Sequence, residues 1–260
     1  MIHSTAIIDP SAKLGSHVEV GAYTVIGAEV EIGDGTKIGP HAVIKGPTRI
    51  GRDNQIFQFS SVGERTQALT PDDDRGVLEI GDRNIIREFT TLNRGNTAHG
   101  GVTKIGNDNL LMAYTHVAHD CHLGNHIIMS NAASLAGHAT VEDHAILGGF
   151  TLVHQFVRIG EHAFSGMGSA INCDVPPYVT VAGNHASAFG INKEGLKRRG
   201  FSPEALRGLH KAYMLLIRAR GKREAAIEEL APFIQQHPEV KKFVEFIQNS
   251  TRAVVRHGRE

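Results

Sequence analysis

Histidines beside a carboxylate are the residues of this 260-residue chain with the clearest chemical potential. Eight of its 16 histidines fall between His116 and His162, and His119 directly precedes Asp120. A neutral imidazole can remove a hydroxyl proton near pH 7, and a neighbouring carboxylate orients the ring and stabilises the imidazolium that forms. Several imidazoles together can instead bind zinc. Which chemistry applies depends on the side chains that the fold brings together.

A six-residue repeat runs through the part of the chain that carries these histidines. Ile, Leu or Val begins 24 of the 26 hexads between Ile2 and Ile171, and glycine often follows. A helix cannot keep every sixth residue on one face, and a simple alternating strand does not need glycine at a fixed place in every six residues, so the repeat indicates short strands separated by turns. We expect the aliphatic residue to point inward and the glycine to adopt the turn conformation.

The repeat resembles that of the hexapeptide-repeat family over residues 1–179. The resemblance implies a mainly β fold, a left-handed parallel β-helix with three hexads in each coil of 18 residues. Residues 18 apart then lie above one another, so His119 stacks with Gly137, and Asp120 stacks with His138. We expect a cluster on one edge of three adjacent coils, made of His116, His119, Asp120, Gly137, His138, His154 and Gln155.

General-base catalysis is the first interpretation of this cluster. His119 is the base, Asp120 orients it, and the Gly137 amide donates to a developing oxyanion. Cys121 is expected to be packed rather than reactive, which favours direct transfer without a covalent intermediate. The alternative is a zinc site like that of the γ-class carbonic anhydrases, whose ligand pattern the spacing does not reproduce, so we expect no metal and no other cofactor. The remaining histidines of the region are expected to be solvent-facing turn residues: His122, His126, His144 and His162.

Two interruptions and a change of composition define the rest of the chain. The hexads break at 63–77 and 94–104, which we expect to be loops ejected from the coil. We predict a β-helix domain over 1–190 and a C-terminal α-helical domain over 191–260. Helical spacing and a start signal at Ser202 predict three helices there, over 202–221, 225–236 and 240–255.

Charge and composition exclude several classes of protein. The chain has no net charge, but residues 1–190 carry 12 basic and 19 acidic groups, and residues 191–260 carry 15 and 8. The basic C-terminal segment is expected to dock an acidic partner, and without interleaved aromatics it does not favour nucleic acid. Only two cysteines, no apolar run that could span a membrane and no signal peptide at Met1 predict a cytoplasmic protein.

Longer strings extend the resemblance to the whole chain. They include Ala118-His119-Asp120-Cys121, Leu135-Ala136-Gly137-His138, Val153-His154-Gln155-Phe156 and Glu194-Gly195-Leu196-Lys197-Arg198-Arg199. Together they resemble the UDP-N-acetylglucosamine O-acyltransferase family. The resemblance implies a homotrimer with clefts between neighbouring prisms. It also implies transfer of a 3-hydroxyacyl group from acyl carrier protein to the 3-OH of UDP-N-acetylglucosamine, the first step of lipid A and lipopolysaccharide synthesis.

The resemblance also implies roles for individual residues. His119 is the general base, Asp120 its orienting partner and the Gly137 amide the oxyanion donor. The remaining matched positions line the substrate cleft or hold the nucleotide and the phosphopantetheine that arrives with the carrier: Gln67, His116, His138, His154, Gln155, Asn192, Glu194, Arg198 and Arg199.

Two departures from the family pattern bear on specificity. Ala68 and Thr70 stand where the family commonly has Asp and Lys, and Asn93 stands where His is common. These changes leave open a 3-amino sugar nucleotide as acceptor, with an amide product. Met167 stands where long-acyl members have glycine, so it would fill the end of an acyl groove that His185 lines. We therefore predict a shorter acyl group, 3-hydroxydecanoyl.

Overall fold

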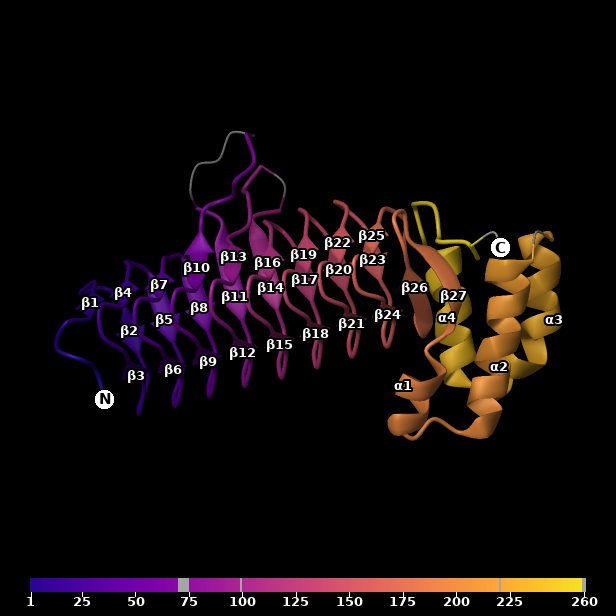
Figure 1. Cartoon of the computed structure of the whole chain (residues 1–260), viewed down its shortest axis with the longest axis horizontal. Helices are drawn as coiled ribbons and strands as arrows, with labels where there is room; N and C mark the ends of the chain where they lie inside the picture. Colours follow the sequence, from indigo (N-terminus) through magenta and orange to yellow (C-terminus); the bar gives the residue numbers. More distant parts are fainter. Residues whose placement is uncertain (70–74, 99, 220, 259–260) are drawn as a thin grey trace.

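A computed structural model shows a long prism of short strands with helices gathered at its C-terminal end (Figure 1). It describes residues 1–69, 75–98, 100–219 and 221–258. The strands wind around three sides and form three sheets, each running the length of the prism. Parallel pairing joins the strands of successive coils, so the architecture is a parallel β-helix.

The first sheet contains nine parallel strands in the spatial order of their coils: Ile7–Ile8 (β1), Val25–Ile26 (β4), Val43–Ile44 (β7), Ser61–Glu64 (β10), Thr91–Asn93 (β13), His116–Val117 (β16), Ser134–Leu135 (β19), Leu152–Val153 (β22) and Ala170–Ile171 (β25). The second sheet contains eight: Lys13–Leu14 (β2), Val30–Ile32 (β5), Thr48–Ile50 (β8), Val77–Ile80 (β11), Val102–Ile105 (β14), His122–Leu123 (β17), Thr140–Val141 (β20) and Arg158–Ile159 (β23).

The third sheet contains ten strands, of which the last pairs antiparallel: Glu19–Val20 (β3), Lys37–Ile38 (β6), Gln55–Ile56 (β9), Ile85–Ile86 (β12), Leu110–Leu111 (β15), Ile128–Met129 (β18), Ile146–Leu147 (β21), Phe164–Ser165 (β24), Val179–Ala182 (β26) and Ser187–Ile191 (β27). In the regular coils, residues 18 apart are partners, as His116 and Ser134 show. The predicted coil length is therefore confirmed around the histidine cluster.

The hexad aliphatics fill the prism, as predicted: Ile26, Ile44 and Leu111 are buried. The expected role of glycine was wrong. The left-handed turn positions are mostly held by other residues, such as Tyr23 with φ +56°. A Cβ on Gly21 would lie 2.5 Å from a backbone nitrogen of the next coil. Glycine is needed there because neighbouring coils approach closely, not because the turn demands a positive φ.

Both breaks in the repeat leave the coil in their described residues, which are 65–69 and 75–76 in the first and 94–98 and 100–101 in the second. They are shorter than predicted, because strands β10, β11 and β14 extend into the segments that the hexads left out. Lys104, for example, pairs with His122 of the next coil. We call residues 65–76 the first loop and residues 94–101 the second loop. Thr70 lies outside the described residues.

Helices close the C-terminal end of the prism: Lys193–Arg198 (α1), Pro203–Tyr213 (α2), the π-helical Met214–Arg218 (η1), Arg223–Gln236 (α3) and Pro238–Gln248 (α4). The helix expected over 240–255 ends at Gln248, and the one expected to reach residue 221 ends at Arg218. Beyond α4 the chain returns to the prism, where the Val255 N–H donates to the Asp174 carbonyl at 2.9 Å. None of the described helices has both the length and the apolar character to cross a bilayer.

Candidate active site

His119 and Asp120 form a hydrogen-bonded dyad in the turn between β16 and β17. His119 Nδ1 lies 2.8 Å from Asp120 Oδ2, and the Asp120 side chain is buried. Because an ionised carboxylate only accepts hydrogen bonds, Nδ1 carries the ring proton and Nε2 has a free lone pair. The dyad therefore has the arrangement of a general base held by its carboxylate.

Gly137 lies on the coil above the dyad, as the 18-residue spacing predicted. A Cβ on Gly137 would lie 2.7 Å from His119 Nε2, so the basic nitrogen faces this glycine. Within the described ranges, no acceptor takes a hydrogen bond from the Gly137 N–H. A free backbone N–H beside the base is what an oxyanion donor requires.

Two further imidazoles border the dyad. The His138 ring stands at 88° to the His119 ring, with centroids 5.2 Å apart, and its Nε2 lies 3.9 Å from Asp120 Oδ2. His116 Nδ1 lies 2.7 Å from Thr91 Oγ1. Burial, with a smaller effect of His119, lowers the pKa of His116, so this ring is neutral near pH 7. The cluster predicted from the 18-residue spacing is thus assembled by the fold.

The third coil adds His154 and Gln155, which are both exposed. His154 Nδ1 lies 3.2 Å from the Gln155 carbonyl oxygen, and Phe156 stacks on His138 with centroids 4.5 Å apart. These residues extend the site along the edge between the first and second sheets. We call this edge, with Asp120, His138 and Phe156 at its turns, the dyad edge.

The residues at this position fit metal binding and nucleophilic catalysis less well than they fit general-base catalysis. His119, Asp120 and His138 have ligand atoms within 4.8 Å of one another. Metal binding through His119 Nδ1 would, however, break its hydrogen bond to Asp120. Cys121 is buried, its Sγ donates to the Ala136 carbonyl at 3.2 Å, and burial raises the pKa of its thiol to about 12. Cys121 is therefore packed, as predicted, and its thiol is protonated.

The C-terminal residues of the predicted site lie on a different edge, between the second and third sheets. Asn192 Nδ2 donates to the His162 carbonyl at 3.1 Å, and Asn192 Oδ1 accepts from the Gly195 N–H at 3.2 Å, which caps α1. The Arg199 guanidinium donates to His144 Nδ1 at 2.9 Å, while Glu194 and Arg198 are exposed. Within one chain, the second sheet separates all four residues from the dyad.

A ladder of three stacked histidines marks this second edge, which we call the ladder edge. His126 and His144 stack at 4.7 Å, as do His144 and His162. The expectation that these are ordinary solvent-facing residues was wrong for His162, which is only 9% exposed because Tyr178 and Phe201 cover it. Burial lowers the pKa of His162 to about 4, and burial and Arg199 lower that of His144.

Residues tied to acceptor specificity divide into two groups. Gln67 and Ala68 are exposed on the first loop. Asn93 is instead buried, and its Nδ2 donates to the carbonyls of Glu64 and Arg65 at 3.2 and 2.9 Å. Asn93 therefore supports the base of the first loop, and its amide is engaged with the backbone rather than presented to a ligand.

Met167 and His185 lie on the third edge, between the third and first sheets. Met167 is 81% exposed, and His185 is exposed in the turn between β26 and β27. The Ala170 N–H donates to the Gly183 carbonyl at 3.0 Å, which holds that turn beside the Met167 coil. In one chain Met167 is an open surface residue, so any groove that it closes needs a second wall.

Sequence reasoning missed the residues that hold Asp120. They are Asn96 and Gly101 on the second loop and Thr103 on β14, and each makes a hydrogen bond to Asp120. The contacts on the carboxylate come from backbone N–H groups, so residue type does not reveal them. The break in the hexads shortly before the dyad was the available signal.

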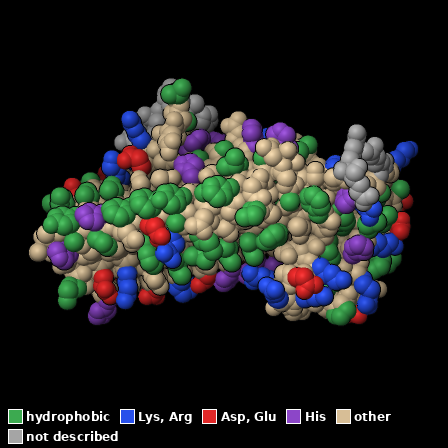
Figure 2. All heavy atoms as spheres, in the orientation of Figure 1, with side chains coloured by type: hydrophobic (Ala, Val, Ile, Leu, Met, Phe, Trp, Pro, Cys, Tyr) green, Lys and Arg blue, Asp and Glu red, His purple; other side chains and the backbone are tan. Residues whose placement is uncertain are grey.

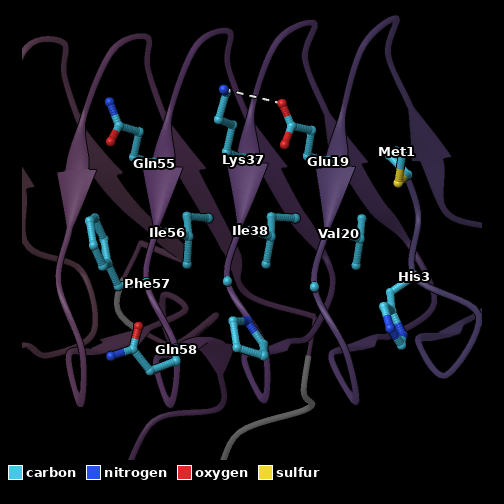
Figure 3. Close-up of a pocket in the computed structure, with 13 residues that line it drawn as sticks. Met1, His3, Glu19, Val20, Lys37, Ile38, Gln55, Ile56, Phe57 and Gln58 are labelled. Carbon is cyan, nitrogen blue, oxygen red and sulfur yellow. Dashed lines mark ion pairs between the residues drawn. The ribbon is translucent and has the colours of Figure 1, made fainter.

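A pocket of about 450 Å³ lies far from the dyad, at the N-terminal end of the third sheet (Figure 3). Val20, Ile38 and Ile56 contribute to its lining, and the Lys37–Glu19 ion pair spans one side at 3.1 Å. Its lining brings no pair of imidazole and carboxylate together comparable to the dyad, so this pocket is not the candidate active site.

Comparisons with known proteins agree with the geometry. A family described as Udp N-acetylglucosamine O-acyltransferase, Domain 2, matches residues 174–255, and one described as Bacterial transferase hexapeptide (six repeats) matches 11–46. The acyl-(acyl-carrier-protein)–UDP-N-acetylglucosamine O-acyltransferases of Herminiimonas arsenicoxydans and Stutzerimonas stutzeri are 51% and 53% identical to this chain. Each match covers 98% of this chain and 99% of the relative. A solved structure of LpxA from Acinetobacter baumannii, 45% identical, matches with a TM-score of 0.95 over 98% of this chain and 99% of that chain. The predicted fold class, a left-handed parallel β-helix with a C-terminal helical region, is confirmed.

Proposed function

The chain belongs to the UDP-N-acetylglucosamine O-acyltransferase family, and we propose that it transfers a 3-hydroxyacyl group from acyl carrier protein to the 3-OH of UDP-N-acetylglucosamine. In this role it is an enzyme of the first step of lipid A synthesis. The observation that carries the proposal is the dyad: Asp120 Oδ2 lies 2.8 Å from His119 Nδ1, and His119 Nε2 faces the Cβ position of Gly137 at 2.7 Å.

The reaction follows from these positions. His119 Nε2 removes the proton of the sugar 3-OH as its oxygen attacks the thioester carbon. The Gly137 N–H donates to the oxyanion of the tetrahedral intermediate. The C–S bond then breaks, and the imidazolium returns the proton to the phosphopantetheine thiolate. Cys121 is buried and protonated, so transfer is direct, without an acyl-enzyme. No metal and no resident cofactor is needed, because the carrier brings its own phosphopantetheine.

A homotrimer would complete the site. Asn192, Glu194, Arg198 and Arg199 lie on the ladder edge and His119 on the dyad edge, so a cleft between neighbouring prisms would bring the two sets together. The third edge offers a surface for such packing, because its exposed aromatic rings stack in a row with centroids 4.9–5.4 Å apart. Apolar side chains form a long band on the prism surface (Figure 2). The rings of this aromatic edge are Tyr23, His41, Phe59, Phe89 and Tyr114.

The carrier protein has a matching surface on the helical cap. A pocket of about 540 Å³ between α1 and α2 includes Phe201 and Leu206 in its lining, together with Lys193, Arg207 and Lys211. Such a surface suits an acidic protein whose binding segment also presents apolar side chains. We propose the carrier as this partner and the cytoplasm as the location, where the unpaired cysteines stay reduced.

The acceptor is proposed to carry a 3-OH rather than a 3-NH2. Asn93 was one of the departures that left the amine open, and its side chain is engaged with the Glu64 and Arg65 carbonyls. Ala68 is exposed, so the 3-amino sugar nucleotide stays the alternative acceptor and is tested in the same assay.

The test is an acylation assay with 3-hydroxyacyl carrier proteins of several lengths and UDP-N-acetylglucosamine. We expect product from the unaltered protein and a loss of about 10³-fold or more for His119→Ala, at the upper end of general-base contributions. His122→Ala, an exposed histidine on the adjacent strand, is the matched control and should keep full activity. If product forms only with a 3-amino sugar nucleotide, the acceptor is that sugar and not UDP-N-acetylglucosamine. If a chelator abolishes the activity, the enzyme depends on a metal.

Mixing two inactive variants tests the shared site. If each cleft takes His119 from one subunit and Arg199 from its neighbour, a trimer reassembled from His119→Ala and Arg199→Ala chains contains some clefts in which both residues are unaltered. Partial recovery of activity on mixing is expected, whereas no recovery from reassembled mixed trimers would place both residues in one subunit's site.

A further inference from the structure

We propose that Thr103, together with the backbone amides of the second loop, positions Asp120 and thereby the catalytic base. The proposal rests on the function proposed above, since it assigns Thr103 a part in orienting the His119–Asp120 dyad. Thr103 contacts neither substrate nor the reacting atoms and acts through Asp120, so it is a positioning residue. The second loop is then more than a tolerated insertion in the solenoid.

Asp120 is held at three separate points. Its backbone N–H donates to Thr103 Oγ1 at 2.8 Å. Its Oδ1 accepts from the Gly101 N–H at 2.9 Å, and its Oδ2 accepts from the Asn96 N–H at 3.1 Å. The last bond shares Oδ2 with His119 Nδ1 at 2.8 Å. The two amide contacts fix the plane of the carboxylate, and the Thr103 contact fixes the backbone from which it projects.

The backbone of Asp120 needs such support. Its φ of +58° lies in the left-handed region, which costs a non-glycine residue free energy. Ring stacking accompanies many of the other left-handed positions of the prism, such as Phe59 with Phe89 at 5.3 Å. At left-handed positions without a ring, such as Asp53, the turn N–H donates to a carbonyl of the preceding coil, here Asp34 at 2.9 Å; at Asp120 the Thr103 hydroxyl accepts that N–H instead.

The loop contributes contacts that a regular coil does not. Asp143, another carboxylate at a turn, accepts a backbone N–H through Oδ1, from Asn125 at 2.8 Å in the coil below. Asp120 accepts a backbone N–H on each of its two oxygens, and both donors belong to the segment that leaves the coil. The departure of residues 94–101 from the repeat thus brings two amides to the single carboxylate that orients the base.

Thr103 offers a clean test because the prism contains a matched residue. Thr103 is buried, and so is Thr36, whose Oγ1 accepts from the Asn54 N–H at 3.2 Å in a coil far from the dyad. Thr→Val at either position removes a buried hydroxyl that satisfies a turn N–H, with little change in volume. Thr36 Oγ1 also donates to the Gly51 carbonyl at 3.0 Å, so Thr36→Val carries at least the structural cost of Thr103→Val but acts far from the dyad.

The experiment compares Thr103→Val, Thr103→Ser and Thr36→Val in the full-length protein. For Thr103→Val we expect kcat to fall about 10- to 100-fold, since small misplacements of catalytic groups have effects of this size. The KM values for both substrates should change less than about threefold, because no binding group is removed. Thr103→Ser should restore most of kcat, and Thr36→Val should lower the melting temperature at least as much as Thr103→Val while keeping kcat.

A second readout does not depend on acyl transfer. His119 should react faster with diethylpyrocarbonate at pH 7 in Thr103→Val than in Thr36→Val, as followed by mass spectrometry of the His119 peptide, because a loosened Asp120 releases the ring. If the unaltered protein transfers no acyl group but this difference appears, the proposed function fails and the positioning role stands. Equal kcat and equal His119 reactivity in the two valine variants overturn the positioning role.

Discussion

Gly137→Ala should disable the base while leaving the fold intact. The added Cβ would lie 2.7 Å from His119 Nε2 and 2.8 Å from Cε1, whereas ordinary contacts begin near 3.4 Å. The ring must therefore move by about 0.7 Å or rotate, which strains its hydrogen bond to Asp120. The His119 side chain is 16% exposed, so it can move toward solvent without disturbing the core.

The size of the effect follows from this displacement. A misplacement of 1 Å costs about 100-fold in rate, so we expect kcat to fall roughly 30- to 100-fold. Alanine keeps the backbone N–H, so the oxyanion donor is not removed and the loss reports on the base. The melting temperature should change by no more than a few degrees, since Gly137 does not have a left-handed backbone that alanine would strain.

The assay measures kcat and KM for Gly137→Ala beside Gly149→Ala. Gly149 occupies the same position in the turn of a neighbouring edge, and a Cβ there would meet its nearest atom at an ordinary 3.5 Å. Full activity is expected for Gly149→Ala. If Gly137→Ala keeps kcat within about threefold of the unaltered enzyme while properly folded, the argument that His119 works against the Gly137 face is refuted.

Three further predictions concern specificity and stability. Met167→Gly should shift the preferred donor from 3-hydroxydecanoyl toward longer acyl groups, because it removes a side chain from the end of the proposed groove; competition between donors of different length measures this, and an unchanged preference contradicts it. Asn93→Ala should raise the KM for the sugar nucleotide with little change in kcat, because the first loop loses two hydrogen bonds at its base; steady-state kinetics with varied acceptor decides between this and a loss of kcat. The pKa of His162 is lowered to about 4, so between pH 6.5 and 4 the unfolded chain binds a proton that the folded chain does not, and the folded state loses up to about 1.4 kcal/mol per pH unit. His162→Phe keeps an aromatic ring in the ladder and should reduce the fall in melting temperature over this range; an identical pH dependence in the two proteins would show that His162 does not titrate in this way.

The sequence predicted the prism and the cluster around the dyad because the resemblance to the hexapeptide-repeat family implied a coil of 18 residues. With 18 residues per coil, Gly137 must lie above His119 and His138 above Asp120, and the structure has this register. Residue type and spacing carry the information in such a regular solenoid. The helix boundaries were less predictable, since the segment after Gln248 pairs with the prism through contacts that are distant in sequence.

Other features depend on the backbone and escaped sequence reasoning. The burial of His162 comes from Tyr178 and Phe201, which approach from the end of the prism and from the cap. Asn93 looked like a substituted ligand-binding residue, but its amide satisfies two carbonyls of the first loop. A hexad pattern does not show which residues bury a ring, as at His162, or which atoms a side-chain amide binds, as at Asn93.

The location of the dyad follows from what a solenoid can and cannot supply. Regular coils place side chains along an edge at fixed spacing, which is sufficient to bring His119, Gly137 and His138 together. They leave an ionised carboxylate at that edge with few donors, because most backbone N–H groups are engaged in pairing between coils. In a segment that leaves the coil, backbone N–H groups are not used for pairing between coils. Two N–H groups of the second loop donate to the Asp120 carboxylate. The proposed catalysis therefore depends both on the regularity that aligns the imidazoles and on the interruption that holds Asp120.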